Sequence, residues 1–180
     1  MKKILALLFC SFFLLGCQND AKTCQTLVEN YCQTMQKGEV QKANTYLKQA
    51  QPSNIDQMAK EAGYTGKIKA YFVKYMKHVI GKQWDSYQVS DVSQGKDFYL
   101  VTVRAKGISA KAYQESGQDT FTEAFQAKLQ ANPNNKAKLF KDYYLQLEKE
   151  ANQLPLVKRQ VIFTCRQVKG EWKITSIDLD

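Results

Sequence analysis

The sequence has one histidine among its 180 residues, and it contains no CxxC, GxSxG, HExxH or glycine-rich phosphate-loop motif. A single histidine cannot complete a Cys/His zinc site of regular spacing. The other missing motifs are the usual signatures of serine hydrolases, zinc proteases and nucleotide-binding loops. We therefore expect no metal and no cofactor, and we interpret the folded domain as non-catalytic.

Two side chains are candidates for catalytic groups, and the sequence offers neither of them the partner that catalysis needs. His78 falls at the edge of an apolar helical stripe, close to Tyr71, and no carboxylate at helical spacing would orient its ring. Cys165 would act as a nucleophile only with a base beside it, and the sequence offers none. Asp85 and Asp91 flank or lie in a predicted strand, where carboxylates are usually solvated. We predict no catalytic residue.

The chain also lacks a hydrophobic run long enough to span a membrane. Its apolar run, residues 4–15, is shorter than the about 20 residues that a spanning helix needs. Lys2 and Lys3 precede this run, and Gly16 and Cys17 follow it. A basic start, a short apolar middle and a small residue at the end are typical of an export signal.

Residues 14–17, Leu-Leu-Gly-Cys, resemble the lipobox of bacterial lipoproteins. This resemblance implies that residues 1–16 are a signal peptide and that Cys17 is acylated as the new N-terminus. Residues 17–22 are short and polar, and we predict a tether that holds the domain close to the membrane. The expected location is membrane-anchored and extracytoplasmic, at the cell surface or the periplasmic face. The alternative is a plain secreted protein in which Cys17 belongs to a disulfide framework.

The charge of the chain is strongly basic, with 26 Lys and Arg against 17 Asp and Glu, or +9. Removing Lys2 and Lys3 with the signal leaves 24 against 17, or +7, for the mature chain. Export argues against a nucleic-acid partner, so anionic lipid head groups, wall polymers or an envelope protein are the candidate partners. Because the lysines are spread along the chain, a solvated surface also explains them.

Three cysteines remain in the mature chain besides Cys17: Cys24, Cys32 and Cys165. Eight residues of continuous helix separate Cys24 from Cys32 by about 12 Å, which exceeds the roughly 7 Å that a disulfide can bridge. Cys165 is therefore the candidate partner of one of them. Cys24 lies near the middle of the helical apolar stripe and Cys32 on its flank, so we favour a Cys24–Cys165 disulfide. Three buried free thiols remain the alternative.

Hydrophobic periodicity predicts helices first and antiparallel strands later, which is an α+β pattern. Three- and four-residue apolar steps predict helices over residues 23–37, 39–50, 55–62, 68–80, 120–131 and 136–153, with a Thr120–Glu123 capping box at the start of the fifth. Alternating patterns predict strands over residues 83–92, 98–107, 157–169 and 171–179, with residues 108–113 extending the second or starting another. We expect one α+β domain over residues 23–180.

Two segments resemble the NTF2-like, cystatin-like-fold superfamily. Residues 35–47, MQKGEVQKANTYL, resemble its helix–glycine–helix opening, and residues 170–180, GEWKITSIDLD, resemble its closing strand. The resemblance implies N-terminal helices packed on a curved antiparallel sheet that forms a cone. Helices at about 120–153 would be an insertion between the central strands, which puts an open pocket in doubt. Some members are enzymes with an Asp or His base beside a Tyr.

Placed on such a frame, Tyr71, Tyr75, Tyr99 and Trp172 would line the space between helix and sheet as a candidate pocket. Core packing is the competing role for these rings, because large aromatics fill interiors before they line sites. We expect a non-catalytic binding or interaction module of the cell envelope. The alternative function is a small enzyme or isomerase that uses the interior of the cone.

Overall fold

The computed structural model describes residues 2–50, 55–116 and 123–179, with side chains from residue 19 onward. The first half contains α1 (Lys2–Gln36), α2 (Val40–Ala43), η1 (Asn44–Tyr46), α3 (Ile55–Glu61), α4 (Gly66–Gln83), β1 (Ser86–Gln94) and β2 (Tyr99–Ile108). The second half contains α5 (Ala110–Glu115), α6 (Glu123–Ala131), η2 (Pro133–Asn135), α7 (Lys136–Gln153), β3 (Leu156–Val168) and β4 (Glu171–Leu179). The predicted α+β class and the four predicted strands are confirmed.

The four strands form one antiparallel sheet in the order β1-β2-β3-β4. Alternate residues of the two central strands are buried: Val101, Val103 and Ala105 on β2, and Val161, Phe163 and Cys165 on β3. Side chains along a strand point alternately to opposite faces, so these residues make one apolar inner face. The outer face carries the polar residues of the same strands.

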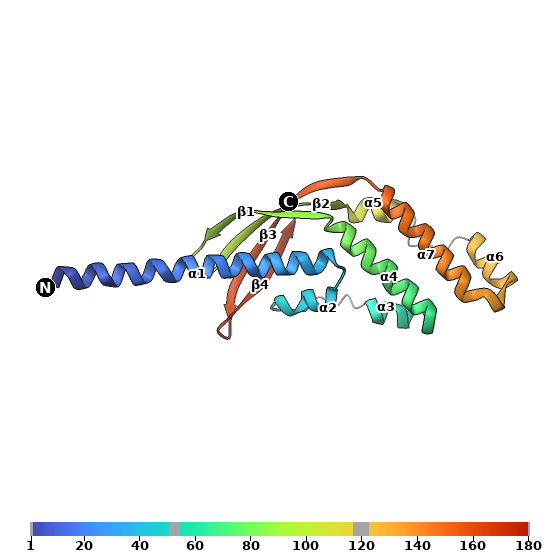
Figure 1. The fold of residues 1–180 in the computed structure, drawn as a ribbon, viewed down its shortest axis with the longest axis horizontal. Helices are drawn as coiled ribbons and strands as arrows, with labels where there is room; N and C mark the ends of the chain where they lie inside the picture. The colour runs from blue at the N-terminus through green and yellow to red at the C-terminus, as the bar shows by residue number, and fades with distance from the viewer. Residues whose placement is uncertain (1, 51–54, 117–122, 180) are drawn as a thin grey trace.

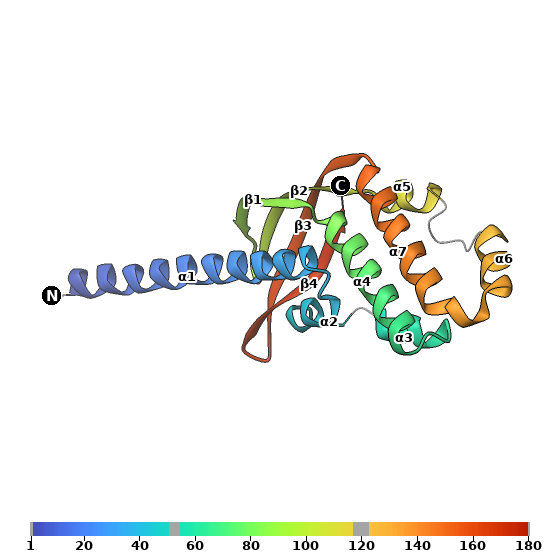
Figure 2. The same ribbon diagram turned by 45° about the vertical axis from the view of Figure 1, so that its right-hand side comes forward.

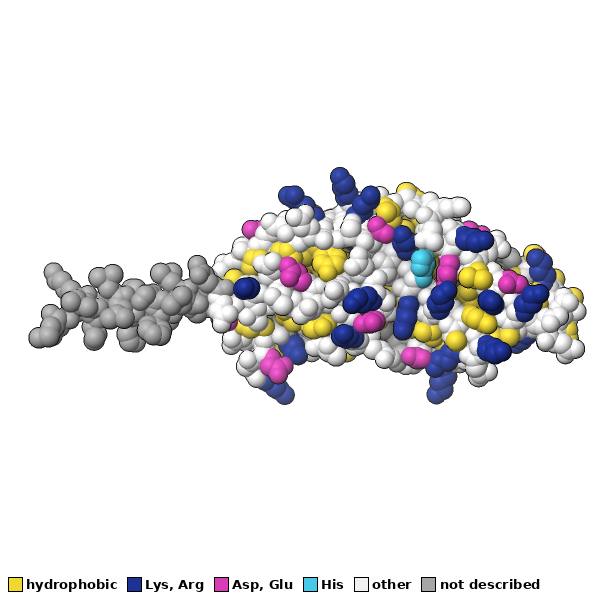
Figure 3. Space-filling view, viewed as in Figure 1, with side chains coloured by type: hydrophobic (Ala, Val, Ile, Leu, Met, Phe, Trp, Pro, Cys, Tyr) yellow, Lys and Arg dark blue, Asp and Glu magenta, His cyan; other side chains and the backbone are white. Residues whose placement is uncertain are grey.

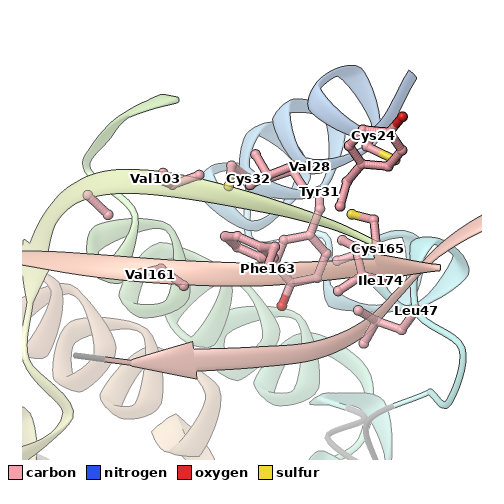
Figure 4. Packing of buried hydrophobic residues seen from close by; sticks show 14 of the residues in the cluster. Cys24, Val28, Tyr31, Cys32, Leu47, Val103, Val161, Phe163, Cys165 and Ile174 are labelled. Carbon is pink, nitrogen blue, oxygen red and sulfur yellow. The ribbon is translucent and has the colours of Figure 1, made fainter. Parts of the chain in front are cut away.

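Helix α1 covers the inner face of the sheet (Figures 1 and 2). Cys24, Val28 and Cys32 are fully buried against β2 and β3, and the ring of Tyr31 lies 5.6 Å from that of Phe163 (Figure 4). The predicted apolar stripe of this helix is therefore the face that builds the first core.

The start of α1 differs from the prediction that a helix opens at Thr23. The Thr23 hydroxyl donates to the carbonyl of Asn19 at 2.8 Å, so Thr23 lies inside a helix that is already formed. The helix ends at Gln36 as expected, because Gly38 has a φ of +67° that favours glycine. A Cβ at Gly38 would also lie 2.3 Å from the carbonyl oxygen of Lys77, so glycine lets α4 approach closely.

The segment after Gly38 forms less helix than the predicted 39–50. Helix α2 and η1 together end at Tyr46, and Leu47 has extended backbone. Leu47 bridges Ile174 in parallel, and the N–H of Lys48 donates to the carbonyl of Ile174 at 2.8 Å. Pairing with the edge strand β4 therefore replaces the last turns of the expected helix.

The remaining helices form a second lobe beside the sheet, where α4 and α7 lie side by side (Figures 1 and 2). This lobe has its own core, made of Tyr75, Val79, Ile108, Tyr113, Phe125, Phe140, Tyr144, Leu147 and Ala151. Helices α5, α6 and α7 lie between β2 and β3 in sequence, where the prediction placed a helical insertion. Residues 110–115 are helix rather than strand, because Ser109 accepts a hydrogen bond from the N–H of Ala112 as an N-cap. Thr120, the predicted start of the capping box, lies outside the described residues.

Candidate functional site

The predicted aromatic pocket is split between the two cores. Tyr75 is buried in the helical lobe, where its ring stacks on Tyr144 at 5.4 Å and its hydroxyl lies 2.9 Å from that of Tyr113. Tyr71 packs against the same cluster. These two tyrosines therefore fill the α4–α7 interface and do not face the sheet.

Tyr99 and Trp172 belong instead to the core between α1 and the sheet. Their rings meet edge to face at 5.4 Å, and the indole N–H of Trp172 donates to Asp20 at 3.2 Å. The four aromatics thus do not surround one cavity, and the expectation of a shared pocket is corrected. The physical reason is that α4 buries its apolar face against α7, while α1 covers the sheet.

The two candidate catalytic side chains make hydrogen bonds to an amide and to a thiol, although Asp85 lines the same surface hollow as His78. The ring of His78 contacts the side-chain oxygen of Asn152 at 3.1 Å, so it joins α4 to α7 through an amide. Cys165 is buried and hydrogen-bonded to the thiol of Cys24, and that contact and burial raise the pKa of the Cys165 thiol. For Cys165, this arrangement favours the neutral thiol.

The three described cysteines are free thiols in the structure, and all are buried. Cys24 and Cys165 contact each other across the α1–sheet interface, while Cys32 lies farther along the helix (Figure 4). Burial first, and the charge of Glu29 second, raise the pKa of Cys32 to about 12. The structure thus brings together the pair that we favour for a disulfide, and the disulfide itself stays a prediction.

The outer face of the sheet carries a hollow of about 580 Å³ across the adjoining ends of β1, β2 and β3. It is lined by Ser86, Tyr87, Gln88, Arg104, Ala105, Lys106, Lys158, Arg159 and Gln160. Ala105 is buried and contributes to the inner core, so the neighbouring Arg104 and Lys106 project outward. The hollow is therefore floored by backbone and bordered by polar and basic side chains.

Two rows of paired residues place the cations of the hollow side by side. In the first row Ser86 pairs with Lys106, and Lys106 pairs with Lys158. In the second row Arg104 stands between a glutamine of β1 and a glutamine of β3. Directly opposite residues have Cβ atoms about 5 Å apart, and like charges at that spacing repel. Neither row contains a carboxylate, so the three cations have no opposite charge within their own rows. The next row of the same face, in which Thr102 pairs with Asp91 and Ile162 pairs with Asp178, contains two.

A further cation, Arg159, lies on the opposite face of the sheet from Arg104 and Lys106, because it pairs with the inward-facing Ala105. The guanidinium of Arg159 donates to the carbonyl of Gln83 at 2.5 Å and lies 5.0 Å from the centre of the Trp84 ring. Burial lowers the pKa of Arg159, and its Nε atom is buried without a hydrogen-bond partner among the described residues. Arginine remains charged at neutral pH, so Arg159 places a positive charge on the inner side of the sheet and not among the cations of the hollow.

The end of α4 meets the sheet directly beside the hollow. A Cβ at Gly107 would lie 2.1 Å from the carbonyl oxygen of Gln83, so only glycine permits this approach of β2 to α4. The contact fixes the end of β2 where Arg104 and Lys106 lie. Elsewhere, Figure 3 shows Lys and Arg side chains spread over α4 and α7 among carboxylates, as on an ordinary solvated surface.

Sequence reasoning found part of this site and missed the rest. Alternation along β2 places Arg104 and Lys106 on the solvent face of a strand, as the pattern of residues 98–107 predicts. The pairing of Lys106 with Lys158 depends on the register between β2 and β3, and 47 residues of chain lie between the end of β2 and the start of β3. No local pattern carries that register, so the cluster was not predicted.

Among the described residues, no group of three or more His, Cys, Asp or Glu side chains lies close enough together to hold a metal ion. No family model, curated protein or solved structure matches the chain.

Proposed function

We propose that this chain is a lipid-anchored extracytoplasmic protein whose folded domain binds an anionic partner and is not an enzyme. The anchor rests on the order of Lys2 and Lys3, the apolar run 4–15 and the Leu-Leu-Gly-Cys motif that ends at Cys17. In the part of the chain that the structure describes, no helix is long and apolar enough to cross a membrane. Acylation would therefore supply the attachment.

The observation that carries the binding proposal is the basic hollow. Arg104, Lys106 and Lys158 stand in two adjacent rows without a carboxylate, although repulsion between directly opposed lysines costs stability. A cluster that is unfavourable in the free protein suits a bound anion, which would relieve the repulsion. The hollow is open to solvent and bordered by cations, so it fits a chain of repeated phosphate or carboxylate groups better than an enclosed small molecule.

The proposed partner is an anionic polymer of the cell envelope. Extension along the outer face of a sheet lets successive negative groups meet successive cations, and such binding weakens as salt screens the charges. An acidic segment of an envelope protein offers the same charge, and the test below separates the two.

The relationship to the NTF2-like superfamily is also a proposal, and it rests on residues 35–47 and 170–180. Its support is the glycine break after α1 and the closing hairpin, in which Ile174 of β4 is buried against the helices. The test is an experimental structure compared with known folds. Structural similarity to a member of that superfamily would support the relationship, and similarity to other folds alone would refute it.

The binding proposal is tested with the full-length acylated protein in detergent, titrated with poly(glycerol phosphate) and separately with polyglutamate. We expect the double variant Lys106→Gln/Lys158→Gln to lose at least about tenfold in affinity, equivalent to about 1.4 kcal/mol. The matched control, Lys128→Gln/Lys149→Gln, removes the same charge from exposed positions of α6 and α7 and should bind as the wild type does.

Each outcome of this titration has a definite meaning. Binding of poly(glycerol phosphate) that is lost only in the hollow variant supports the proposed polymer partner. Binding of polyglutamate alone favours an acidic protein partner. Equal losses in the hollow variant and in its control, or no binding to either polymer, would refute the hollow as the site.

A further inference from the structure

Two strand connections lie at the same end of the domain as the acylation site. Trp172, beside the β3–β4 turn, donates to Asp20 near the start of the described part of α1. Cys24 contacts Cys165, whose strand partner is Tyr99, the first residue after the β1–β2 turn. Figures 1 and 2 show both connections on the side from which α1 enters the domain.

The distance from this end to the lipid is short whatever the local backbone conformation. Asp20 is three residues after Cys17, and three residues span about 11 Å even when fully extended. The hydrogen bond to Trp172 shows that the chain is already docked on the domain at Asp20. The expected tether therefore has only two residues, 18 and 19, between the acylated position and the first docked side chain.

The surface at this end is basic. Lys22, Lys96 and Lys169 are exposed, and no ion pair of theirs is found in the described parts of the chain. The other cations of this end are paired, Arg166 with Asp97 and Lys173 with Glu171.

Aromatic side chains stiffen both turns. The Arg166 guanidinium lies 4.8 Å from the centre of the Phe98 ring, and that ring folds back on the Gly95 backbone of the same turn. Trp172 packs edge to face on Tyr99, so the second turn is held against the core. The exposed lysines thus stand on rigid supports.

We infer that the tips of the two hairpins form a membrane-contacting surface that docks on anionic lipid head groups. Lys96 and Lys169 lie at the two tips, and Lys22 lies two residues after Asp20 on α1. This inference rests on the proposed lipid anchor at Cys17, because acylation brings this end within about 11 Å of the bilayer. Anionic head groups attract basic residues that lie within a Debye length of the surface.

Docking at the hairpin tips would set the orientation of the whole domain. The basic hollow lies at the opposite ends of the same strands: seven residues of β2 separate Tyr99 from Lys106, or about 24 Å. With the tips on the membrane, the hollow points away from the lipid and toward the envelope space. The two basic surfaces therefore serve different partners.

The chain contains a matched pair of fluorescent reporters for this orientation. Trp172 lies at the proposed contact, and Trp84 is buried in the core on the inner face of the sheet, between Arg159 and Phe163. The full-length acylated protein is reconstituted into vesicles of phosphatidylglycerol and phosphatidylcholine that carry a quencher on the head group. Trp84→Phe leaves Trp172 as the only reporter, and Trp172→Phe leaves Trp84.

We expect the emission of Trp172 to fall at least about twofold, while that of Trp84, which is buried beside Phe163 farther along the strands from the hairpin tips, falls clearly less. Should Trp84→Phe fail to fold, the difference in quenching between wild type and Trp172→Phe measures the same quantity. The charge-reversed variant Lys96→Glu/Lys169→Glu should lose the quenching of Trp172, and Lys128→Glu/Lys149→Glu on the helical lobe should keep it.

The outcomes separate this inference from the proposed anchor. A vesicle-bound protein whose two tryptophans are quenched equally, or whose Trp172 is unquenched, would overturn the membrane-contacting surface and leave the anchor intact. Quenching that survives charge reversal at Lys96 and Lys169 would overturn the role of these lysines. A protein that is neither acylated nor recovered with the vesicles would refute the anchor, and the docking inference with it.

Discussion

Reversing one charge in the basic hollow should make the protein more stable while removing its binding site. Lys106 and Lys158 are direct partners on adjacent strands, and Arg104 is a diagonal neighbour of Lys158 on the same face. Lys158→Glu turns a repulsive cross-strand pair into an attractive one. An opposed pair of this kind contributes roughly 0.2–1 kcal/mol, so ending the repulsion and adding an attraction should gain about 1 kcal/mol.

The gain is small because these side chains are exposed, and it is therefore measured against matched variants. For a chain of this size about 1 kcal/mol raises the melting temperature by roughly 2–4 °C. Lys158→Gln removes only the repulsion and should give about half of that gain. Lys149→Glu makes the same charge change at an exposed position of α7 and should leave the melting temperature unchanged.

Salt provides the decisive control for this prediction. At 1 M salt the Debye length is about 3 Å, so the difference between Lys158→Glu and the wild type should almost vanish. Thermal unfolding followed by circular dichroism at low and high salt measures both effects. A Lys158→Glu protein that is less stable than the wild type, or a gain that persists in high salt, would refute the proposed repulsion.

Three further predictions concern the core between α1 and the sheet. Burial raises the pKa of Tyr31 from 10.0, and that of Cys32 from 9.0, to about 12. The unfolded chain therefore loses these protons first, and the free energy of unfolding should fall as pH rises from about 9 to 12, by up to about 4 kcal/mol for Cys32. Urea unfolding at rising pH measures this loss, and a profile that stays flat would contradict it. Mild oxidation should join Cys24 to Cys165, and an unreduced peptide map that shows Cys32 in the disulfide would count against the observed packing. Phe163→Ala should cost about 3–5 kcal/mol in urea unfolding, because the ring is fully buried, and a loss below about 1 kcal/mol would show that the core is packed differently.

Local pattern predicts the strands of this protein well and the partners of its helices poorly. Residues 101–106 alternate between apolar and polar, and β2 occupies residues 99–108. The stripe on α4 likewise predicts a buried face, but a stripe does not say what buries it. Helix α7 carries its own aromatic stripe, and the stripes of α4 and α7 bury each other. Tyr71 and Tyr75 are therefore packed in the lobe, away from Tyr99 and Trp172.

The candidate site shows the same division between local and long-range information. The outward position of Lys106 follows from alternation, whereas its pairing with Lys158 follows from register across the inserted helices. The contact between Cys24 and Cys165 was favoured because both lie on apolar faces, and the structure places the two thiols together. In contrast, nothing local shows that Leu47 leaves the helix to bridge Ile174, because the partner strand lies at the other end of the chain.

Anchoring through Cys17 is tested most directly by mass spectrometry of the mature N-terminal peptide from the membrane fraction. The predicted peptide begins at Cys17 and carries the mass of a diacylglyceryl group, and Cys17→Ala moves the protein out of the membrane fraction. An intact Met1, an unmodified Cys17, or unchanged membrane retention of the Cys17→Ala variant would contradict the lipid anchor.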